Sequence, residues 1–486
     1  MKIPILSGVY TGEGADYKTS YPVNMMPVIQ GTGISDSYLR PVRGISQIGT
    51  GPGISRGAIN WEGVHYRVMG STLCGISETG TVTDFGDVGN DGKQVAFDYS
   101  FDILAIASNG NLFYFYDSVT VDDSTWTFSL VQTTGDYKLI QVTDVDLGTV
   151  VDMIWVDGYF MTTDGEFLVV TELNDPTSVN VLKYGSSEID PDPVLGLLKL
   201  RNEVYAVNRY TIEIFDNIGG SLFPFQRVSG AQIEKGALGT HCSVVYEEMI
   251  AFLGSGRNES PGVYLASGGR ANKISTREID ETLSNFTEEE LSRSIMETMN
   301  DKSHKLLWIN IPDRTLVYDL TSSTALGEPI WYIMTSSTIG FSPYRGKDVV
   351  WCYDAWQVGD AISAKVGVLE DNSSLHFGDV VRWEFGTKIV YNGGRGALFP
   401  RLELIALTGR YSSENPAVIS TSYSVDGRIW SQERTIEVGA LGERTKRLVW
   451  RRQGQMRNIR IQRFTGDSNA YISVSCLEID IEPLGV

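Results

Sequence analysis

The sequence is poor in the side chains that most enzymes use for chemistry. It holds 4 His and 4 Cys in 486 residues, and no CxxC pair occurs. Widely separated cysteines of this kind exclude a disulfide framework and a cysteine zinc site. The histidines stand in four separate segments, with no HExxH motif and no predicted nucleophile elbow. We therefore expect neither a histidine-dependent catalytic triad nor a zinc protease.

Long apolar runs and excess positive charge are also missing. No stretch approaches the roughly 18 apolar residues of a membrane-spanning helix, so no membrane span is predicted. The first residues carry a single Lys, and Pro4 and Gly8 interrupt their apolar run, so we expect no signal peptide. With 60 Asp+Glu against 40 Lys+Arg, the formal net charge is −20. This charge argues against a protein that wraps nucleic acid by neutralising phosphates.

Glycine and aromatic residues, in contrast, are abundant. The chain contains 51 Gly, 10 Trp, 23 Tyr and 18 Phe, and 42% of its residues are hydrophobic. Glycine favours turns and aromatic residues favour strands, so this composition is typical of an all-β protein. The apolar fraction is sufficient for a sizeable core.

Short apolar or aromatic runs, each followed by a turn and a second strand, recur about every 47 residues, close to the repeat of a four-stranded propeller blade. The runs are HYRVM, ILAIAS, YFMTTD, EVYAVNR, MIAFLG, KLLWINI and VVWCYDA, which begin at residues 65, 103, 159, 203, 249, 305 and 349. The pattern predicts a divergent β-propeller of six or seven blades. A β-sandwich or a series of unrelated hairpins remains the alternative.

Three parts follow from these patterns: an extended N-terminal strap over residues 1–55, a β-propeller-like domain over 56–395 and a C-terminal β-sandwich over 396–486. Prolines in the first part oppose regular strand pairing. One helix is predicted near residues 287–300, where Thr287 and Glu290 form a capping box and an apolar face follows. We expect this helix to pack on the flank of the propeller; a docking helix for a neighbouring subunit is the alternative.

The C-terminal part alternates apolar and polar residues, as in NIRIQRF and LEIDIE, which predicts half-buried antiparallel strands. Asp426-Gly427 predicts a tight type I′ hairpin.

The net charge of the C-terminal part differs from that of the rest of the chain. Residues 401–486 hold 12 basic and 10 acidic residues, which leaves 28 basic and 50 acidic residues in 1–400. The acidity therefore belongs to the strap and the propeller, at −22, against +2 for the rest.

The C-terminal part contains one basic run that no acidic residue interrupts. Its members are Arg444, Lys446, Arg447, Arg451, Arg452, Arg457, Arg460 and Arg463. Arginine favours bidentate carboxylate pairing, so we hypothesise an interface with the acidic propeller of a neighbouring subunit. A solvated sheet face that balances nearby acidic strands is the plain alternative. Nucleic-acid binding is less favoured because few aromatic residues are interleaved.

Other candidate sites are weak. GPGISRG at residues 51–57 resembles a phosphate loop, but it precedes a strand and opens no helix.

Propeller glycosidases work with paired carboxylates, and with 60 acidic residues in the chain the composition does not exclude such a pair. The alternative function is therefore a propeller enzyme, a glycosidase or lyase acting on bacterial surface polysaccharide. A host-receptor adhesin is a third possibility, although no β-helix repeat is visible.

An ordered set of segments resembles one known family. YPVNMMPV, SYLRPVRGI, SRGA and HYRVMGSTL in the first 73 residues, FTEEELSRSIMET and SHKLLWINIPDRTLVYD at 286–319, and RLVWRRQGQMRNIRIQRF near the end carry the resemblance. They are similar to the tail accessory factors, or packaged-DNA stabilisation proteins, which form the tail hub of short-tailed bacteriophages (podoviruses). The similarity runs in the same order through nearly the whole chain.

This resemblance implies a non-enzymatic structural protein of the virion, made in the host cytoplasm. A homohexamer would form the tail hub, or nozzle, below the portal and the head-to-tail adaptor ring. It would extend the DNA channel, retain packaged DNA, hold the tail needle and mount tailspikes or tail fibres. The resemblance brings no catalytic, cofactor-binding or metal-binding residues. We expect DNA to pass through the channel without specific binding, since an acidic wall repels phosphate.

Overall fold

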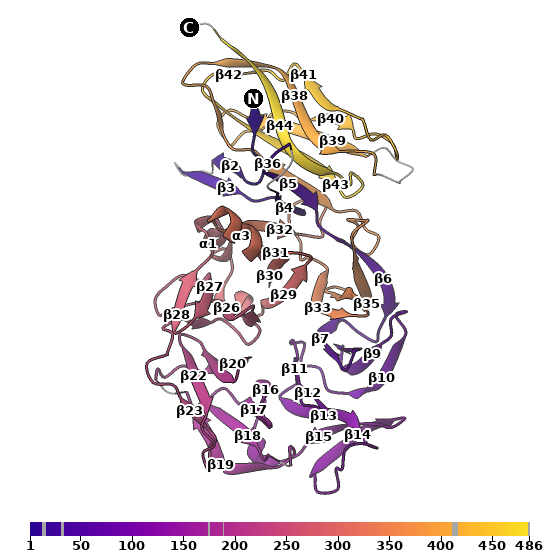
Figure 1. Ribbon diagram of the computed structural model, residues 1–486, viewed down its shortest axis with the longest axis vertical. Helices are drawn as coiled ribbons and strands as arrows, with labels where there is room; N and C mark the ends of the chain where they lie inside the picture. Colours follow the sequence, from indigo (N-terminus) through magenta and orange to yellow (C-terminus); the bar gives the residue numbers. More distant parts are fainter. Residues whose placement is uncertain (12–15, 31–33, 174, 188, 411–416, 485–486) are drawn as a thin grey trace.

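The computed structural model divides into a ring of small sheets and a sandwich stacked on one side of that ring (Figure 1). The described residues are 1–11, 16–30, 34–173, 175–187, 189–410 and 417–484. Within them, no helix is long and apolar enough to cross a membrane. The four cysteines are buried and unpaired.

The first four blades follow one another along the chain, each as an antiparallel sheet. Blade 1 contains β7 (Ser55–Trp61), β8 (Val64–Met69), β9 (Thr72–Ile76) and β10 (Val82–Asp87). Blade 2 contains β11 (Ala96–Tyr99), β12 (Ile103–Ser108), β13 (Asn111–Asp117), β14 (Phe128–Thr134) and β15 (Tyr137–Val142). Blade 3 contains β16 (Asp152–Val156), β17 (Tyr159–Thr163), β18 (Phe167–Thr171) and β19 (Val179–Ser186). Blade 4 contains β20 (Val194–Leu200), β21 (Glu203–Asn208), β22 (Ile212–Asn217) and β23 (Phe225–Arg227).

The last three blades complete the circle. Blade 5 contains β24 (Gly236–Ala237), β25 (Ser243–Tyr246), β26 (Met249–Ser255), β27 (Gly262–Ser267) and β28 (Arg270–Lys273). Blade 6 contains β29 (Ile295–Asp301), β30 (His304–Ile311), β31 (Arg314–Asp319) and β32 (Trp331–Met334). Blade 7 contains β33 (Gly346–Cys352), β34 (Ala355–Asp360), β35 (Lys365–Glu370) and β6 (Gly44–Thr50).

The innermost strands of these blades contact one another in sequence, and β33 of blade 7 returns to β7 of blade 1. The propeller prediction is thus confirmed, and the described residues form seven blades. Five of the seven apolar runs fall on the second strand of a blade. The run at residue 249 falls on β26, which pairs with both earlier strands of blade 5, and the run at residue 349 falls on the first strand of blade 7.

Blades stack face to face, which explains their nearly continuous apolar strands. All six residues of β12 (ILAIAS) are buried, because the sheet has a neighbouring blade on each side. Separate apolar clusters fill the spaces between successive blades, for example between blades 1 and 2 and between blades 3 and 4. The core is therefore a ring of interfaces around an open axis.

The sandwich consists of two sheets over a shared apolar core. One sheet contains β1 (Lys2–Ile3), β4 (Met25–Ile29), β5 (Ser37–Pro41), β38 (Ala397–Leu407), β41 (Leu448–Arg451), β42 (Gln455–Met456) and β44 (Ser473–Pro483). The other contains β36 (Arg382–Gly386), β37 (Val390–Tyr391), β39 (Val418–Ser424), β40 (Arg434–Glu437) and β43 (Ile459–Asp467). Ile479 is buried and Asp480 is exposed, so the alternation predicted for LEIDIE holds.

The N-terminal segment belongs to both parts of the molecule. It gives β1, β4 and β5 to the sandwich, a hairpin of β2 (Gly8–Thr11) and β3 (Tyr17–Ser20), and then the outer strand β6 to blade 7. The sequence prediction kept residues 1–55 outside the propeller, whereas β6 pairs with β35 from Gly44–Glu370 to Thr50–Lys365. Pro27 and Pro41 lie within β4 and β5, strands of a short hairpin. The segment therefore supplies the outer strand that completes blade 7, the last blade of the ring.

Two local predictions need correction. The helix near 287–300 is one turn only: α2 spans Glu288–Leu291, and Ile295–Asp301 forms β29. The capping box of Thr287 and Glu290 is present, but the innermost position in blade 6 overrides the helical pattern that follows. Two further short helices, α1 (Arg277–Leu283) and α3 (Leu320–Leu326), and a 3-10 turn, η1 (Val145–Leu147), were not predicted.

The Asp426-Gly427 turn lies inside a longer loop. Strands β39 and β40 form a hairpin, but their paired residues begin at Thr421 and Arg434. Asp426 accepts the backbone N–H groups of Arg428 and Ile429, and Gly427 has a φ of 77°. The dipeptide therefore makes an Asx turn within the connection and not the two-residue hairpin that was predicted.

Candidate functional site

The axis of the propeller contains a cavity of about 460 Å³ lined by the innermost strands of the blades. Its polar lining includes Asp98, Asp152, Glu297 and Asp348, together with Lys199 and His241. A group of carboxylates at such a position is what a propeller hydrolase would need. The contacts of each carboxylate decide whether it is free for chemistry.

Three of these carboxylates bind the backbone of the next blade. Asp98 of blade 2 accepts the N–H of Trp155 in blade 3 at 2.6 Å. Asp152 of blade 3 accepts the N–H of Leu197 in blade 4 at 2.7 Å. Glu297 of blade 6 accepts the N–H of Val349 in blade 7 at 2.6 Å. Each acid thus connects the innermost strands of two neighbouring blades.

Asp348 continues the same arrangement from blade 7 to blade 1. It accepts hydrogen bonds from the Ser55 hydroxyl on β7 and from the side chain of Gln94. Arg67, fully buried on β8, lies 3.7 Å from the Asp348 carboxylate and donates to its backbone oxygen at 2.9 Å. Residues Gly53–Gly57 read GxSxG, yet Ser55 is a buried strand residue held by Asp348 and Arg67. This serine has no nucleophile-elbow geometry.

Burial shifts the protonation of these groups. Burial away from water raises the pKa of Asp152 to about 7, and the N–H donors of Leu197 and Met153 oppose that rise. Burial, with the nearby Asp348 charge, raises the pKa of Glu297 to about 7. For Asp348, burial acts to raise the pKa, but Lys347 and Arg67 outweigh it and the pKa is lowered. Burial lowers the pKa of His241 to about 4.

The arrangement is built for cohesion between blades. Both carboxylate oxygens of Asp152 and of Glu297 already accept hydrogen bonds from protein donors. Among the described residues, no three His, Cys, Asp or Glu side chains are grouped to hold a metal ion. Sequence reasoning missed these acids, although each is an isolated carboxylate within or beside an apolar strand. That pattern, repeated in several blades, is the signal that could have found them.

His304 has a structural role at the start of α3. His304 Nδ1 lies 2.6 Å from the Asp319 carboxylate, which also accepts the backbone N–H groups of Thr321 and Ser322 at the start of α3. The Ser322 hydroxyl donates to Asp319 and not to the histidine. Asp319 therefore caps a helix, with His304 and Ser322 bound to its carboxylate, and the three side chains do not form a catalytic triad.

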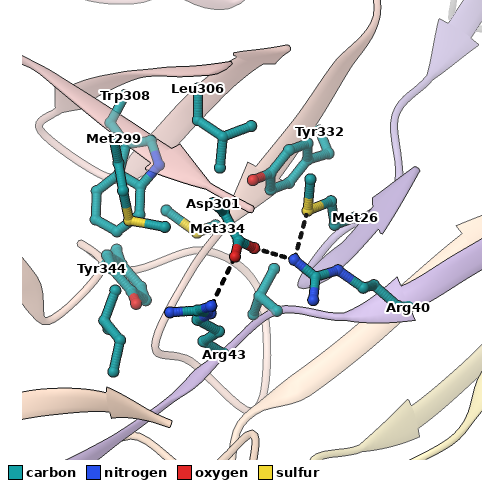
Figure 2. Close-up of a pocket in the computed structure, with 12 residues that line it drawn as sticks. Met26, Arg40, Arg43, Met299, Asp301, Leu306, Trp308, Tyr332, Met334 and Tyr344 are labelled. Carbon is teal, nitrogen blue, oxygen red and sulfur yellow. Dashed lines mark hydrogen bonds and ion pairs between the residues drawn. The ribbon is translucent and has the colours of Figure 1, made fainter. Parts of the chain in front are cut away.

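A second cluster lies where the N-terminal segment passes from the sandwich to blade 7. Figure 2 shows Asp301, at the end of β29, between Arg40 and Arg43. Arg43 Nη2 lies 2.7 Å from Asp301, and its Nε lies 2.9 Å from Asp371. The cavity beside them measures about 20 Å³, enough for one water molecule. The cluster fastens the N-terminal segment to blade 6.

The structure separates the predicted basic run into several environments. Arg460 is buried between Phe399 and Tyr423, with its guanidinium carbon 4.3 and 3.8 Å from the two ring centres. It donates to Gln453 and Gln462, and burial lowers its pKa to about 10. The burial of Arg460 contradicts the prediction that the polar residues of NIRIQRF face away from the core. Arg460 is a core residue of the sandwich.

Two more members of the run are engaged within the chain. Arg447 makes a bidentate pair with Glu403, with both N–O distances at 2.6 Å. Arg463 is half-buried over the Trp430 ring, at 4.3 Å from its centre, and lies 4.0 Å from Glu433. Both guanidinium groups thus have a partner within the chain, although the Arg447 side chain is 66% exposed.

The remaining members lie toward the surface at two places. Arg444 and Lys446 are in the turn before β41, with Arg444 exposed and Lys446 half-buried, and Arg451 is at the other end of that strand. Arg451, Arg452 and Arg457 are exposed. The sequence prediction omitted Arg434 on β40, which donates to the backbone oxygens of Arg451 and Arg452. Only the packing of β40 against β41, an edge strand of the other sheet, brings Arg434 to this place.

The class of protein is now defined: a seven-bladed β-propeller joined to a β-sandwich. Two family models match the same parts of the chain. "Bacteriophage P22 Gp10, beta-propeller" matches residues 1–374, and "Bacteriophage P22 Gp10, beta-sandwich" matches residues 382–482. The chain belongs to this family, and the resemblance found in its sequence segments is confirmed.

Individual relatives agree with the family. The chain is 28% identical over 473 residues to the tail hub protein gp10 of Salmonella phage P22, covering 94% of each protein. Among solved structures, the Neurospora crassa Pan2 WD40 domain is 10% identical, with a TM-score of 0.42, covering 68% of this chain and 96% of that one. The N-terminal domain of Nup159 is 8% identical, with a TM-score of 0.41, covering 68% and 95%. Such TM-scores support no inference about function.

Proposed function

We propose that the chain is a structural tail hub protein of a short-tailed phage. The observation that carries this proposal is the similarity to the P22 tail hub protein over 94% of both chains. The protein then belongs to the virion and is made in the cytoplasm of the bacterial host. It works by assembly: copies of the chain enclose a channel through which the genome leaves.

The finer proposal concerns partners. A homohexamer lies below the portal and the head-to-tail adaptor ring, where it extends the channel, receives the tail needle and mounts tailspikes or tail fibres. Cohesion between blades supports such a role, because a ring around pressurised DNA needs rigid building blocks. The bonds from Asp98, Asp152, Glu297 and Asp348 to neighbouring blades provide that cohesion at the axis of each copy.

The same contacts argue against the polysaccharide-cleaving alternative. A glycosidase needs one carboxyl group free to donate a proton and a second carboxylate free to attack or to activate water. Asp152 and Glu297, whose raised pKa values would suit an acid, have both oxygens engaged by protein donors. We infer that this axial cavity does not cleave sugar chains.

Genetic removal of the chain tests the proposed role. Virus particles made without it should package DNA normally and then lose it, since the portal channel stays open below the adaptor. The measurement is the ratio of filled to empty heads, by electron microscopy and by nuclease protection, with and without the chain supplied from a plasmid. Particles that keep their genome in its absence would contradict the proposal.

A further inference from the structure

Three exposed arginines form a basic corner at the edge of the sandwich, where hydrogen bonds hold the guanidinium of Arg434. Arg434 Nη1 donates to the backbone oxygens of Arg451 and Arg452 at 3.2 and 2.8 Å. In return, Trp450 Nε1 donates to the backbone oxygen of Arg434 at 2.9 Å, and the Trp450 ring is buried. Strands β40 and β41 are thus joined in both directions. We call Arg434, Arg451 and Arg452 the arginine corner.

The charge of this corner is not balanced within the chain. All three residues are exposed, and none forms an ion pair with an acid of the described residues. Other arginines of the sandwich behave differently: Arg401 and Arg447 both pair with Glu403. Three like charges held together in water repel one another. Three exposed positive charges at one place are therefore suited to an anionic partner.

Arginine geometry suits both carboxylate and phosphate, but the side chains near the corner favour a protein carboxylate over single-stranded nucleic acid. Guanidinium groups bind carboxylates through paired hydrogen bonds. Binding of single-stranded nucleic acid uses open aromatic faces on which bases stack. Beside the corner, Trp450 is buried and the Trp430 ring is covered by Arg463.

We propose that the arginine corner binds carboxylates on the propeller of a neighbouring copy of this chain. Residues 1–400 supply the charge, with 50 acidic against 28 basic residues. Figure 1 places β40 and β41 on the sandwich, away from the blades, so the propeller of the same copy does not reach the corner. This inference rests on the proposed assembly of the chain into a ring and identifies one of its contacts.

Zero-length cross-linking tests the contact directly. Arg452→Lys keeps the charge and supplies an amine, which a carbodiimide couples only to a carboxylate in direct contact. A mixture of ¹⁴N- and ¹⁵N-labelled protein distinguishes links between copies from links within one copy. We expect mixed-isotope peptides that join residue 452 to an acid within residues 55–370. Assembled rings without such peptides would overturn the inference.

Charge reversal gives an independent measurement. In Arg451→Glu/Arg452→Glu, the dissociation constant of the assembly at low salt should rise about tenfold or more, because attractive pairs become repulsive. High salt should reduce the difference. Arg451→Ala/Arg452→Ala should show a smaller effect in the same direction. The matched control is Arg201→Glu, an exposed arginine on blade 4, which should leave the constant nearly unchanged.

The outcomes separate the two proposals. A chain that does not self-associate, alone or with its tail partners, contradicts both the ring and the corner. Rings that tolerate the reversal as well as they tolerate Arg201→Glu contradict the corner alone. Binding to a short DNA duplex that disappears in the reversed variant would assign the corner to phosphate and would also overturn the inference.

Discussion

Single carboxylate side chains connect neighbouring blades at the axis of the propeller. Apolar packing between blades is non-directional, so it does not by itself fix how two innermost strands meet. A carboxylate that accepts the N–H of the next blade fixes that position with a directional bond. Asp98, Asp152 and Glu297 each do so, and burial disfavours the charged form of Asp152 and Glu297.

The Asp152 carboxyl should make stability depend on pH. Its pKa is about 7 in the folded protein and near 3.8 when unfolded, so its contribution is complete below about pH 3.8 and is lost as pH rises to 7. At about 1.36 kcal/mol per pKa unit, this loss approaches about 4 kcal/mol. Asp152→Asn cannot ionise, so the fall in its melting temperature between pH 5 and pH 8 should be smaller than in the wild type.

Calorimetry at the two pH values checks this expectation. The variant also loses one acceptor for a backbone N–H, which should cost about 1 kcal/mol at every pH. The change with pH is therefore the informative quantity. Asp146→Asn, an exposed residue of η1, serves as the control and should follow the wild type. An identical pH dependence in Asp152→Asn and wild type would contradict the assignment.

Replacing Arg460 by lysine should destabilise the sandwich. Its planar group stacks between Phe399 and Tyr423 and donates to Gln453 and Gln462. A lysine ammonium cannot fill the flat space or reach the same acceptors. Arg460→Lys should lower the free energy of unfolding by about 2–3 kcal/mol. Arg451→Lys, at an exposed position, should change it by less than about 0.5 kcal/mol in the same denaturant titration.

At the scale of elements, the N-terminal segment determines how the molecule closes. Strand β6 completes blade 7 beside β35, so the last blade contains the beginning of the chain. Before that strand, β4 and β5 join the sandwich sheet, and the Met1 amino group donates to the Ile479 backbone oxygen at 2.8 Å. Asn24 connects blade 6 and the sandwich through bonds to Thr335 and Arg382. Neither part is complete without this segment.

The sandwich should therefore not fold from its C-terminal sequence alone. A fragment of residues 382–486 lacks β1, β4 and β5, which leaves β44 without its partners on one side. It also loses Met25 and Leu39, so the core residues that these two side chains cover become exposed. We expect it to show no cooperative thermal transition. Joining residues 1–43 behind residue 486 through a flexible linker should restore one, because Met1 lies beside Ile479. A cooperative transition in the short fragment would contradict this reading.

At the scale of the whole molecule, charge is distributed unevenly. The sandwich sequence is close to neutral and carries an exposed arginine corner, whereas the rest of the chain is strongly acidic. A channel lined by acidic residues lets DNA move without adhering to the wall. We propose that acids of the propeller line the channel of the assembled ring.

The assembled protein should consequently show negligible affinity for duplex DNA at physiological salt. Fluorescence anisotropy with a labelled duplex measures this directly. Arg201→Glu and the wild type should show the same negligible affinity, since neither presents a continuous basic surface for DNA. Saturable binding by the wild-type ring would contradict the idea of a repelling channel wall.

Much of the fold could be predicted because blade strands carry their own pattern. Runs such as ILAIAS are apolar on both faces, and their spacing shows a repeated four-stranded unit. The segment SRSIMETM could not be assigned in this way. Its helical spacing of Leu291, Ile295 and Met299 is real, but pairing with β30 makes residues 295–301 a strand. Tertiary pairing outweighs a weak local preference.

The candidate sites were less predictable for a related reason. The basic run is contiguous in the sequence, and adjacent strand residues point to opposite faces, so its members could not all share one surface. Arg460 enters the core, Arg447 pairs with Glu403, and Arg434 joins Arg451 from a different strand. The axial acids come from four blades that are far apart in the sequence.

By itself, the sequence determined the all-β class, the propeller repeat, the division of charge and the family, because each depends on composition or on local order along the chain. Only the tertiary structure decided that there are seven blades, that the N-terminus closes the last one, which acids bind neighbouring blades and which arginines remain exposed. These features arise from contacts between residues distant in the chain. Such contacts depend on how sheets meet in space, which no local pattern of side chains encodes.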